Sequence, residues 1–158
     1  MYDALSGGHS KEDFQNFIEG NKVAVLATVS PEWGVQATTV FYAVEKNFSL
    51  LVKSHQGSDH GKGMRSDPQV VMTVYDHSST YTEKSGVQLR AVCERIYDKA
   101  EMQNAVKAYS ERFPGAEQRF APLDELVSPD SKSTLFRMKI VSGKMLTPDG
   151  YSSAFQEF

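Results

Sequence analysis

Residues 23–76 contain the clearest structural signal in the chain: VAVLATVSPEWGVQATTVFYAVEKNFSLLVKSHQGSDHGKGMRSDPQVVMTVYD. Short runs rich in β-branched and apolar residues occur here between turn or loop segments, at 22–30, 35–44, 48–54 and 69–76. This pattern predicts four β-strands. The first two runs are apolar on both faces, whereas a free-standing antiparallel sheet usually has one polar face. One face can fill a barrel and the other needs a helix or a second subunit, so we expect a homodimer.

Two helices and two further strands complete the predicted architecture. Capping-box spacing occurs at Ser10 and again at Asp98, and apolar residues at helical intervals follow each of them. The predicted helices span 11–19 and 98–112, and the further strands span 87–98 and 133–146. Short strands with tight turns and peripheral helices are typical of an antiparallel barrel or sandwich.

The composition limits the kinds of protein that the chain can be. Its 158 residues fit one domain, and its formal charge of −3 argues against broad binding of nucleic acid or of anionic membranes. The N-terminus lacks the pattern of a signal peptide, and no apolar run is long enough to cross a bilayer. Because Cys93 is the one cysteine, neither an intramolecular disulfide nor a thiolate metal cluster is expected. We therefore expect a cytoplasmic protein, with residues 1–9 and 148–158 as flexible tails.

In their order and spacing, the segments resemble the FMN-binding split barrels of the pyridoxamine 5′-phosphate oxidase-like family. The matching motifs are LATVS at 26–30, GMRSDPQV at 63–70 and GVQLRAVCERI at 86–96. The resemblance implies a mainly β, α+β fold: one domain over residues 1–158, built as a six-stranded antiparallel split β-barrel with peripheral helices. It also implies FMN as cofactor, flavin-dependent oxidoreductase activity on a small-molecule substrate or electron donor, and a homodimer with flavin sites at its interface.

The segment VKSHQGSDHGKGMRSDP at 52–68 is the candidate phosphate loop. A phosphate monoester favours cations, hydroxyl groups and free backbone N–H groups, which Ser58, His60, Lys62 and the loop glycines can supply. Composition alone favours a solvated polar loop, whereas the resemblance favours phosphate binding. Through the same resemblance, further residues are expected to contact the flavin ring, its ribityl chain or its phosphate: Thr38, Thr39, Val40, Phe41, Lys53, Ser54 and Gln88.

Two departures from the family pattern leave other functions open. The family's loop commonly reads Ser-Arg-Lys, whereas this chain has Ser58, Asp59 and His60, and the C-terminal segment that pyridoxamine phosphate oxidase uses on its substrate is not recognisable. One alternative is a non-enzymatic module that binds or senses flavin. Another is a haem-binding or haem-degrading protein with His55, His60 or His77 as the iron ligand. The histidines match no compact metal motif, so no metal site is expected, and no residue stands out as a general acid or base.

Overall fold

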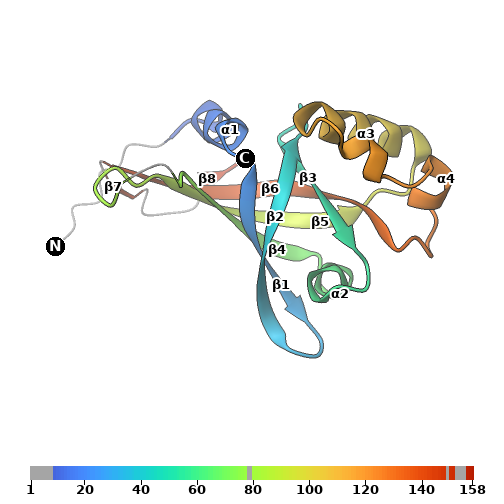
Figure 1. Cartoon of the computed structure of the whole chain (residues 1–158). Helices are drawn as coiled ribbons and strands as arrows, with labels where there is room; N and C mark the ends of the chain where they lie inside the picture. The colour runs from blue at the N-terminus through green and yellow to red at the C-terminus, as the bar shows by residue number, and fades with distance from the viewer. Residues whose placement is uncertain (1–8, 78–79, 149, 152–155) are drawn as a thin grey trace.

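A computed structural model describes residues 9–77, 80–148, 150–151 and 156–158 of the chain. Six antiparallel strands form a closed barrel (Figure 1). Their bounds are β1 Val23–Ser30, β2 Gly34–Val44, β3 Ser49–His55, β4 Gln69–Tyr75, β5 Gly86–Arg95 and β6 Ser133–Thr147. The order around the barrel is β3-β2-β1-β4-β5-β6, and β6 pairs back with β3 along the whole of β3. The predicted six-stranded antiparallel barrel is confirmed.

Alternation along the strands fills the barrel with apolar side chains. In β5, for example, Val87, Leu89 and Ala91 are buried, whereas Gln88 and Arg90 are exposed. Burial of this kind contributes roughly 25 cal/mol for each Å² of apolar surface removed from water. Side chains of the barrel core with almost no exposed surface include Phe14, Ile18, Leu26, Tyr42, Leu50, Met72, Leu89, Phe136 and Met138.

Helices cover one end and one side of the barrel. Helix α1, Lys11–Gly20, begins at Ser10, which exchanges hydrogen bonds with Asp13 in the predicted capping box. Its buried Phe14 and Ile18 join the barrel core. The helices α3 Lys99–Arg112, η1 Ala116–Arg119 (a 3-10 turn) and α4 Leu123–Leu126 follow β5. They pack on the outer side of β2, β3 and β6 through a second apolar cluster (Figure 1).

The barrel is split between β2 and β3. Only Tyr42, Ala43 and Val44 of β2 pair with β3, so residues 34–41 of β2 pair with β1 alone. Helix α2, Asp59–Ser66, follows β3 and packs on β1 beside this opening (Figure 1). The chain thereby places the N-terminus of a helix next to the free edge of a strand.

Local features differ from the expectations drawn from the sequence. The candidate phosphate loop contains the helix α2, and β5 ends at Arg95, three residues before the Asp98 that caps α3. Of the predicted flexible tails, residues 1–8, 149 and 152–155 lie outside the described residues. The short strands β7 Gly150–Tyr151 and β8 Gln156–Glu157 pair with β6. None of the described helices combines the length and the apolar composition needed to cross a membrane.

Candidate functional site

The first candidate cavity, which we call the α2 cavity, lies between the free edge of β2 and the N-terminus of α2. Its volume is about 380 Å³. It is lined by Gln36, Ala37 and Thr38 of β2 and by Gly57, Ser58, Asp59 and His60. Three residues predicted from the sequence, Thr38, Ser58 and His60, therefore meet at one cavity although two different parts of the chain supply them.

Hydrogen bonds organise the N-terminus of α2. The Oγ of Ser58 accepts a hydrogen bond from the N–H of Gly61 at 3.2 Å and donates one to the carbonyl oxygen of His55 at 2.6 Å. The Nε2 of His60 lies 3.3 Å from the same Oγ. The N–H groups of Asp59 and His60 have no partner inside α2, because the first turn of a helix lacks preceding helical carbonyls. These donors and the positive end of the helix dipole favour an anion in the cavity.

The charges around the α2 cavity are mixed. Burial lowers the pKa of His60 below its usual value, and the neighbouring Asp59 carboxylate acts in the opposite direction. The Nζ of Lys62 forms an ion pair with Glu32 at 3.4 Å, and the two side chains are 40% and 61% exposed. An exposed pair of this kind contributes little to stability, so Lys62 can leave Glu32 for a more highly charged anion at small cost.

The second candidate cavity, which we call the α3 cavity, lies where β2 and β3 meet the turn between α3 and η1. Its volume is about 530 Å³, and it is lined by Phe41, Lys53, Tyr109, Phe113, Pro114, Gly115, Ala116, Gln118 and Arg119. The Phe41 ring is edge-on to the Phe113 ring, with 5.6 Å between centroids. The Nζ of Lys53 donates to the carbonyl oxygen of Arg119 at 2.7 Å. Two further predicted residues, Phe41 and Lys53, thus share this cavity.

Five predicted residues line neither cavity: Thr39, Val40, Ser54, Lys62 and Gln88. Val40 is 7% exposed and belongs to the barrel core. Ser54 is also buried, and its Oγ donates a long hydrogen bond, 3.3 Å, to the carbonyl oxygen of His55. Thr39 is exposed on the outer face of β2, opposite Val25 of β1.

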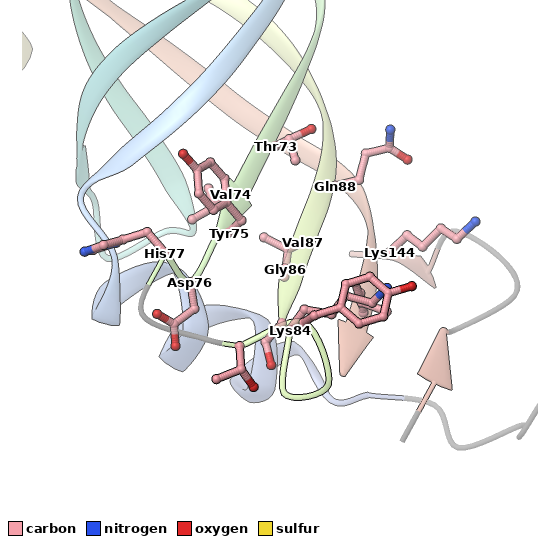
Figure 2. A pocket seen from close by; sticks show the side chains of 14 residues that line it. Thr73, Val74, Tyr75, Asp76, His77, Lys84, Gly86, Val87, Gln88 and Lys144 are labelled. Carbon is pink, nitrogen blue, oxygen red and sulfur yellow. The ribbon is translucent and has the colours of Figure 1, made fainter. Parts of the chain in front are cut away.

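Gln88 lies at a third cavity, of about 560 Å³, on the outer face of β4, β5 and β6. It stands opposite Thr73 of β4 and Lys144 of β6, and Figure 2 shows these three side chains along one side of the cavity. Thr73 is opposite Val25, which is opposite Thr39. Gln88 is therefore three strand spacings from Thr39, roughly 14 Å. Within one chain, it lies too far from the split to join the other predicted residues.

Several lining residues have no role in the family resemblance, Gln36 and Arg119 among them. Gln36 is two residues before Thr38 on the same face of β2, so strand alternation was a usable signal for it. Arg119 ends a 3-10 turn whose position against β3 is set by tertiary packing. No local pattern in the sequence reports such a contact.

The two cavities at the split differ in the chemistry that they can support. The α2 cavity offers backbone N–H donors, hydroxyl groups and an imidazole, which suit a phosphate group. The α3 cavity offers aromatic walls and cations, which suit a planar ring with polar edges. Among the described residues, no group of three or more His, Cys, Asp and Glu side chains is arranged to hold a metal ion.

Solved structures with the same fold occur in several bacteria. A conserved hypothetical protein from Mycobacterium tuberculosis has a TM-score of 0.73 and 19% identity, over 91% of this chain and 88% of its own. An FAD-binding protein from Mesorhizobium loti has a TM-score of 0.65 and 19% identity, over 87% and 92% of the two chains. The haem storage protein HutZ from Vibrio cholerae has a TM-score of 0.66 and 16% identity, over 87% and 93%. Identities this low establish the fold alone.

The sequence comparisons give the family. No curated protein matches the chain at a significant level. The family model described as pyridoxamine 5′-phosphate oxidase matches residues 10–146, which is most of the chain, and the protein therefore belongs to this family.

Proposed function

We propose that the protein is an FMN-dependent oxidoreductase that binds the FMN phosphate in the α2 cavity. The observation that supports this most directly is the meeting of Thr38, Ser58 and His60 at the N-terminus of α2, where the first N–H groups have no partner inside the helix. Donors of these kinds match the oxygens of a phosphate monoester. The described residues that line the cavity include no lysine or arginine, and burial lowers the pKa of the His60 imidazole, so backbone donors and Lys62 carry more of the binding than in a Ser-Arg-Lys loop.

The flavin ring would extend from the α2 cavity along β2 toward Phe41. Phe41 comes three positions after Thr38, which is roughly 10 Å along a strand. The ring would then lie beside the aromatic side chains and Lys53 at the edge of the α3 cavity. When bound, FMN supplies the electron or hydride transfer, and the protein's residues bind it and exclude water from one side.

Removing the phosphate contacts should lower the affinity for FMN but not the affinity for riboflavin. In the double variant Ser58→Gly, Lys62→Gln, glycine keeps most of the capping stability of α2 while the hydroxyl and the ammonium are lost. FMN binding should weaken about 10- to 100-fold, because hydrogen bonds to charged groups contribute about 1.5 to 3 kcal/mol and these are partly exposed. Riboflavin affinity should stay unchanged. Fluorescence titration of both flavins measures the two constants.

The matched control is Lys46→Gln, at an exposed lysine in the turn between β2 and β3. This variant should bind FMN and riboflavin with the same affinities as the unchanged protein. In the unchanged protein, the preference for FMN over riboflavin should decrease as the pH falls through about 6, because the phosphate loses its second charge there while burial holds the pKa of His60 below its usual value. Equal losses for both flavins in the double variant would contradict a phosphate contact at this helix.

We also propose that the functional unit is a cytoplasmic homodimer. The outer face of β1, β4 and the first half of β2 contains apolar side chains such as Val29, Val35 and Val71. Val35 is 78% exposed. A second copy on this face would bury these side chains. In such a dimer, the Gln88 of each subunit would lie near the flavin that the other subunit binds. This arrangement would explain a flavin contact by Gln88 although Gln88 lies too far from the flavin site of its own subunit.

Placing a charge on this face should separate the subunits. Light scattering at micromolar concentration should give twice the mass of one chain, whereas Ala27→Lys should raise the dissociation constant at least about 100-fold, because an unpaired charge is costly to bury. Ala27 is half-buried on the outer face of β1. The control Ala100→Lys, on the exposed side of α3, should remain dimeric. A monomeric, well-folded wild type with and without FMN would refute the dimer.

Haem is the second candidate ligand. The structural neighbours include a haem storage protein, and the half-buried His60 places an imidazole in the α2 cavity. The absorption spectrum of the purified protein separates the candidates, since haem gives a Soret band and flavin gives its two bands in the near-ultraviolet and blue. A Soret band that is lost in His60→Ala would favour haem over FMN.

A further inference from the structure

We infer that Gln56 and Arg95 are positioning residues of the α2 cavity: they hold the turn between β3 and α2, and thereby aim the first N–H groups of the helix at the bound phosphate. Neither side chain lines the cavity itself. The effect on phosphate binding rests on the proposed function. The anchoring of α2 rests on the hydrogen bonds of the turn alone.

Gln56 is buried in the turn between β3 and α2, with 7% of its surface exposed. Each of its polar groups has a partner. Its N–H donates to the carbonyl oxygen of Lys132 at 2.8 Å, and its Nε2 donates to the carbonyl oxygen of Ser131. Its Oε1 accepts a hydrogen bond from Arg95 at 3.2 Å, and its carbonyl oxygen accepts one from Arg65 of α2 at 3.0 Å. A buried polar network with every member satisfied fixes a single arrangement of its residues.

Arg95, the last residue of β5, connects this turn to the loop between α4 and β6. Its guanidinium donates to the carbonyl oxygens of Leu126 at 3.4 Å, of Pro129 at 3.1 Å, and of Ser128. The same group donates to the Oε1 of Gln56. Because a guanidinium presents its donors in a rigid plane, it holds the loop and the turn in a fixed relation to β5.

The anchored turn determines where the N-terminus of α2 lies. The carbonyl oxygen of His55 accepts hydrogen bonds from the N–H and the Oγ of Ser58, at 3.1 and 2.6 Å. This carbonyl group belongs to the peptide bond that joins His55 to Gln56, so the contacts of Gln56 fix its direction. A methyl group at Gly61 would lie 3.1 Å from the Cα of Gln56, which shows that the helix packs directly on this residue.

The direction of the helix matters for this cavity because of the donors that the cavity offers. The described residues that line it include no lysine or arginine, so backbone N–H groups supply much of the expected phosphate binding. A hydrogen bond weakens steeply when its angle departs from linearity, whereas a mobile ammonium group can follow its anion. A small rotation of α2 should therefore lower the affinity for a phosphate.

The test compares Gln56→Met and Arg95→Met with the wild type by fluorescence titration of FMN and riboflavin. Methionine fills a similar space but makes none of the hydrogen bonds. Each variant should bind FMN about 10-fold more weakly and riboflavin with a change of less than about 2-fold, because riboflavin has no phosphate to misalign. If Arg95→Met does not fold, Gln56→Met carries the test, since it leaves the bonds from Arg95 to the loop in place.

Two controls separate positioning from a general loss of stability. Arg112 also donates to backbone carbonyl oxygens, but those of Glu19, Asn21 and Tyr42 tie α3 to α1 and β2 rather than to α2. Arg112→Met should lower the free energy of unfolding and leave the ratio of FMN to riboflavin affinity unchanged. Gln103→Met, at an exposed position of α3, should change neither quantity.

Two results would overturn the inference: an unchanged affinity ratio in both test variants when the wild type prefers FMN, or an equal fall of the ratio in Arg112→Met. Amide hydrogen exchange of the flavin-free proteins covers the case in which the wild type shows no preference. The phosphate proposal then fails. Faster exchange of the α2 amides in Gln56→Met and Arg95→Met, but not in Arg112→Met, would keep the anchoring role, and unchanged exchange in α2 would refute that role as well.

Discussion

Gly61→Ala is expected to lower the free energy of unfolding by about 3 kcal/mol, the upper range for over-packing of a close-packed site. A methyl group at this position would fall well inside van der Waals contact with the carbonyl oxygen of His55 and 3.1 Å from the Cα and carbonyl oxygen of Gln56. His55 ends β3, which is paired with β6 along its length, so these backbone atoms cannot move aside. The helix must move instead, and the N-terminus of α2 would shift away from its cavity. FMN affinity should therefore fall with stability.

Urea unfolding of the flavin-free protein measures this loss. The matched control is Gly20→Ala, at the exposed last residue of α1, where no atom lies within 4 Å of the added methyl group. That change should leave stability the same or raise it slightly, because alanine has less backbone freedom to lose than glycine. Equal unfolding midpoints for the two variants would mean that α2 does not depend on its close approach to β3.

The sequence alone does not show why the candidate phosphate loop contains its glycines. Their number predicted a backbone that approaches an anion, but Gly61 and Gly63 of α2 are buried against the protein itself. A methyl group at Gly63 would lie 2.7 Å from the Oγ1 of Thr28 on β1. Glycine is required both where the backbone approaches a ligand closely and where it approaches another strand closely. Composition cannot separate these two causes, because the neighbour belongs to a distant part of the chain.

The strands and the two longer helices were predictable because their signals are local. β-branched runs between turns and the capping boxes at Ser10 and Asp98 depend only on neighbouring residues, and the structure has these elements close to the expected bounds. The grouping of Thr38 with Ser58 and His60 came from the family resemblance rather than from a pattern. The contact between Lys53 and Arg119 depends on how the turn after α3 docks. The periodicity of apolar residues in the sequence does not predict how this turn docks.

A charge cluster centred on Arg137 ties together four parts of the chain. Strand alternation places Arg137 on the polar side of β6, but its partners come from the turn after β2, from β5 and from α3. Its guanidinium binds both carboxylate oxygens of Glu45 at 2.7 and 3.1 Å. It also reaches Glu101 at 2.8 Å and Glu94 at 3.3 Å. Lys139 pairs with Glu94 at 2.7 Å, so within the described parts of the chain Glu94 is the one carboxylate of the three that keeps an ion pair if Arg137 is removed.

Arg137→Met is expected to cost about 3 kcal/mol of unfolding free energy at pH 7, because removing one partner of a largely buried ion pair leaves the other charge uncompensated. The Arg137 side chain is 12% exposed, while Glu101 is 56% exposed and adds less. The control Lys107→Met, which breaks the exposed pair with Glu111 on α3, should cost about 0.5 kcal/mol or less. Urea unfolding of the three proteins gives both values.

The pH dependence separates charge from packing in this variant. Burial acts to raise the pKa of Glu94, but hydrogen bonds from Lys139 and Arg137 outweigh it and hold the pKa below 4.5. A carboxylate with a lowered pKa stabilises the native state above the unfolded pKa, and this contribution is lost as the pH falls through the native pKa. The difference between wild type and Arg137→Met should therefore shrink as the pH falls below about 5, where Glu94 protonates and its attraction to the Arg137 cation is lost. A difference that stays constant over this range would assign the loss to the missing contacts of the side chain rather than to its charge.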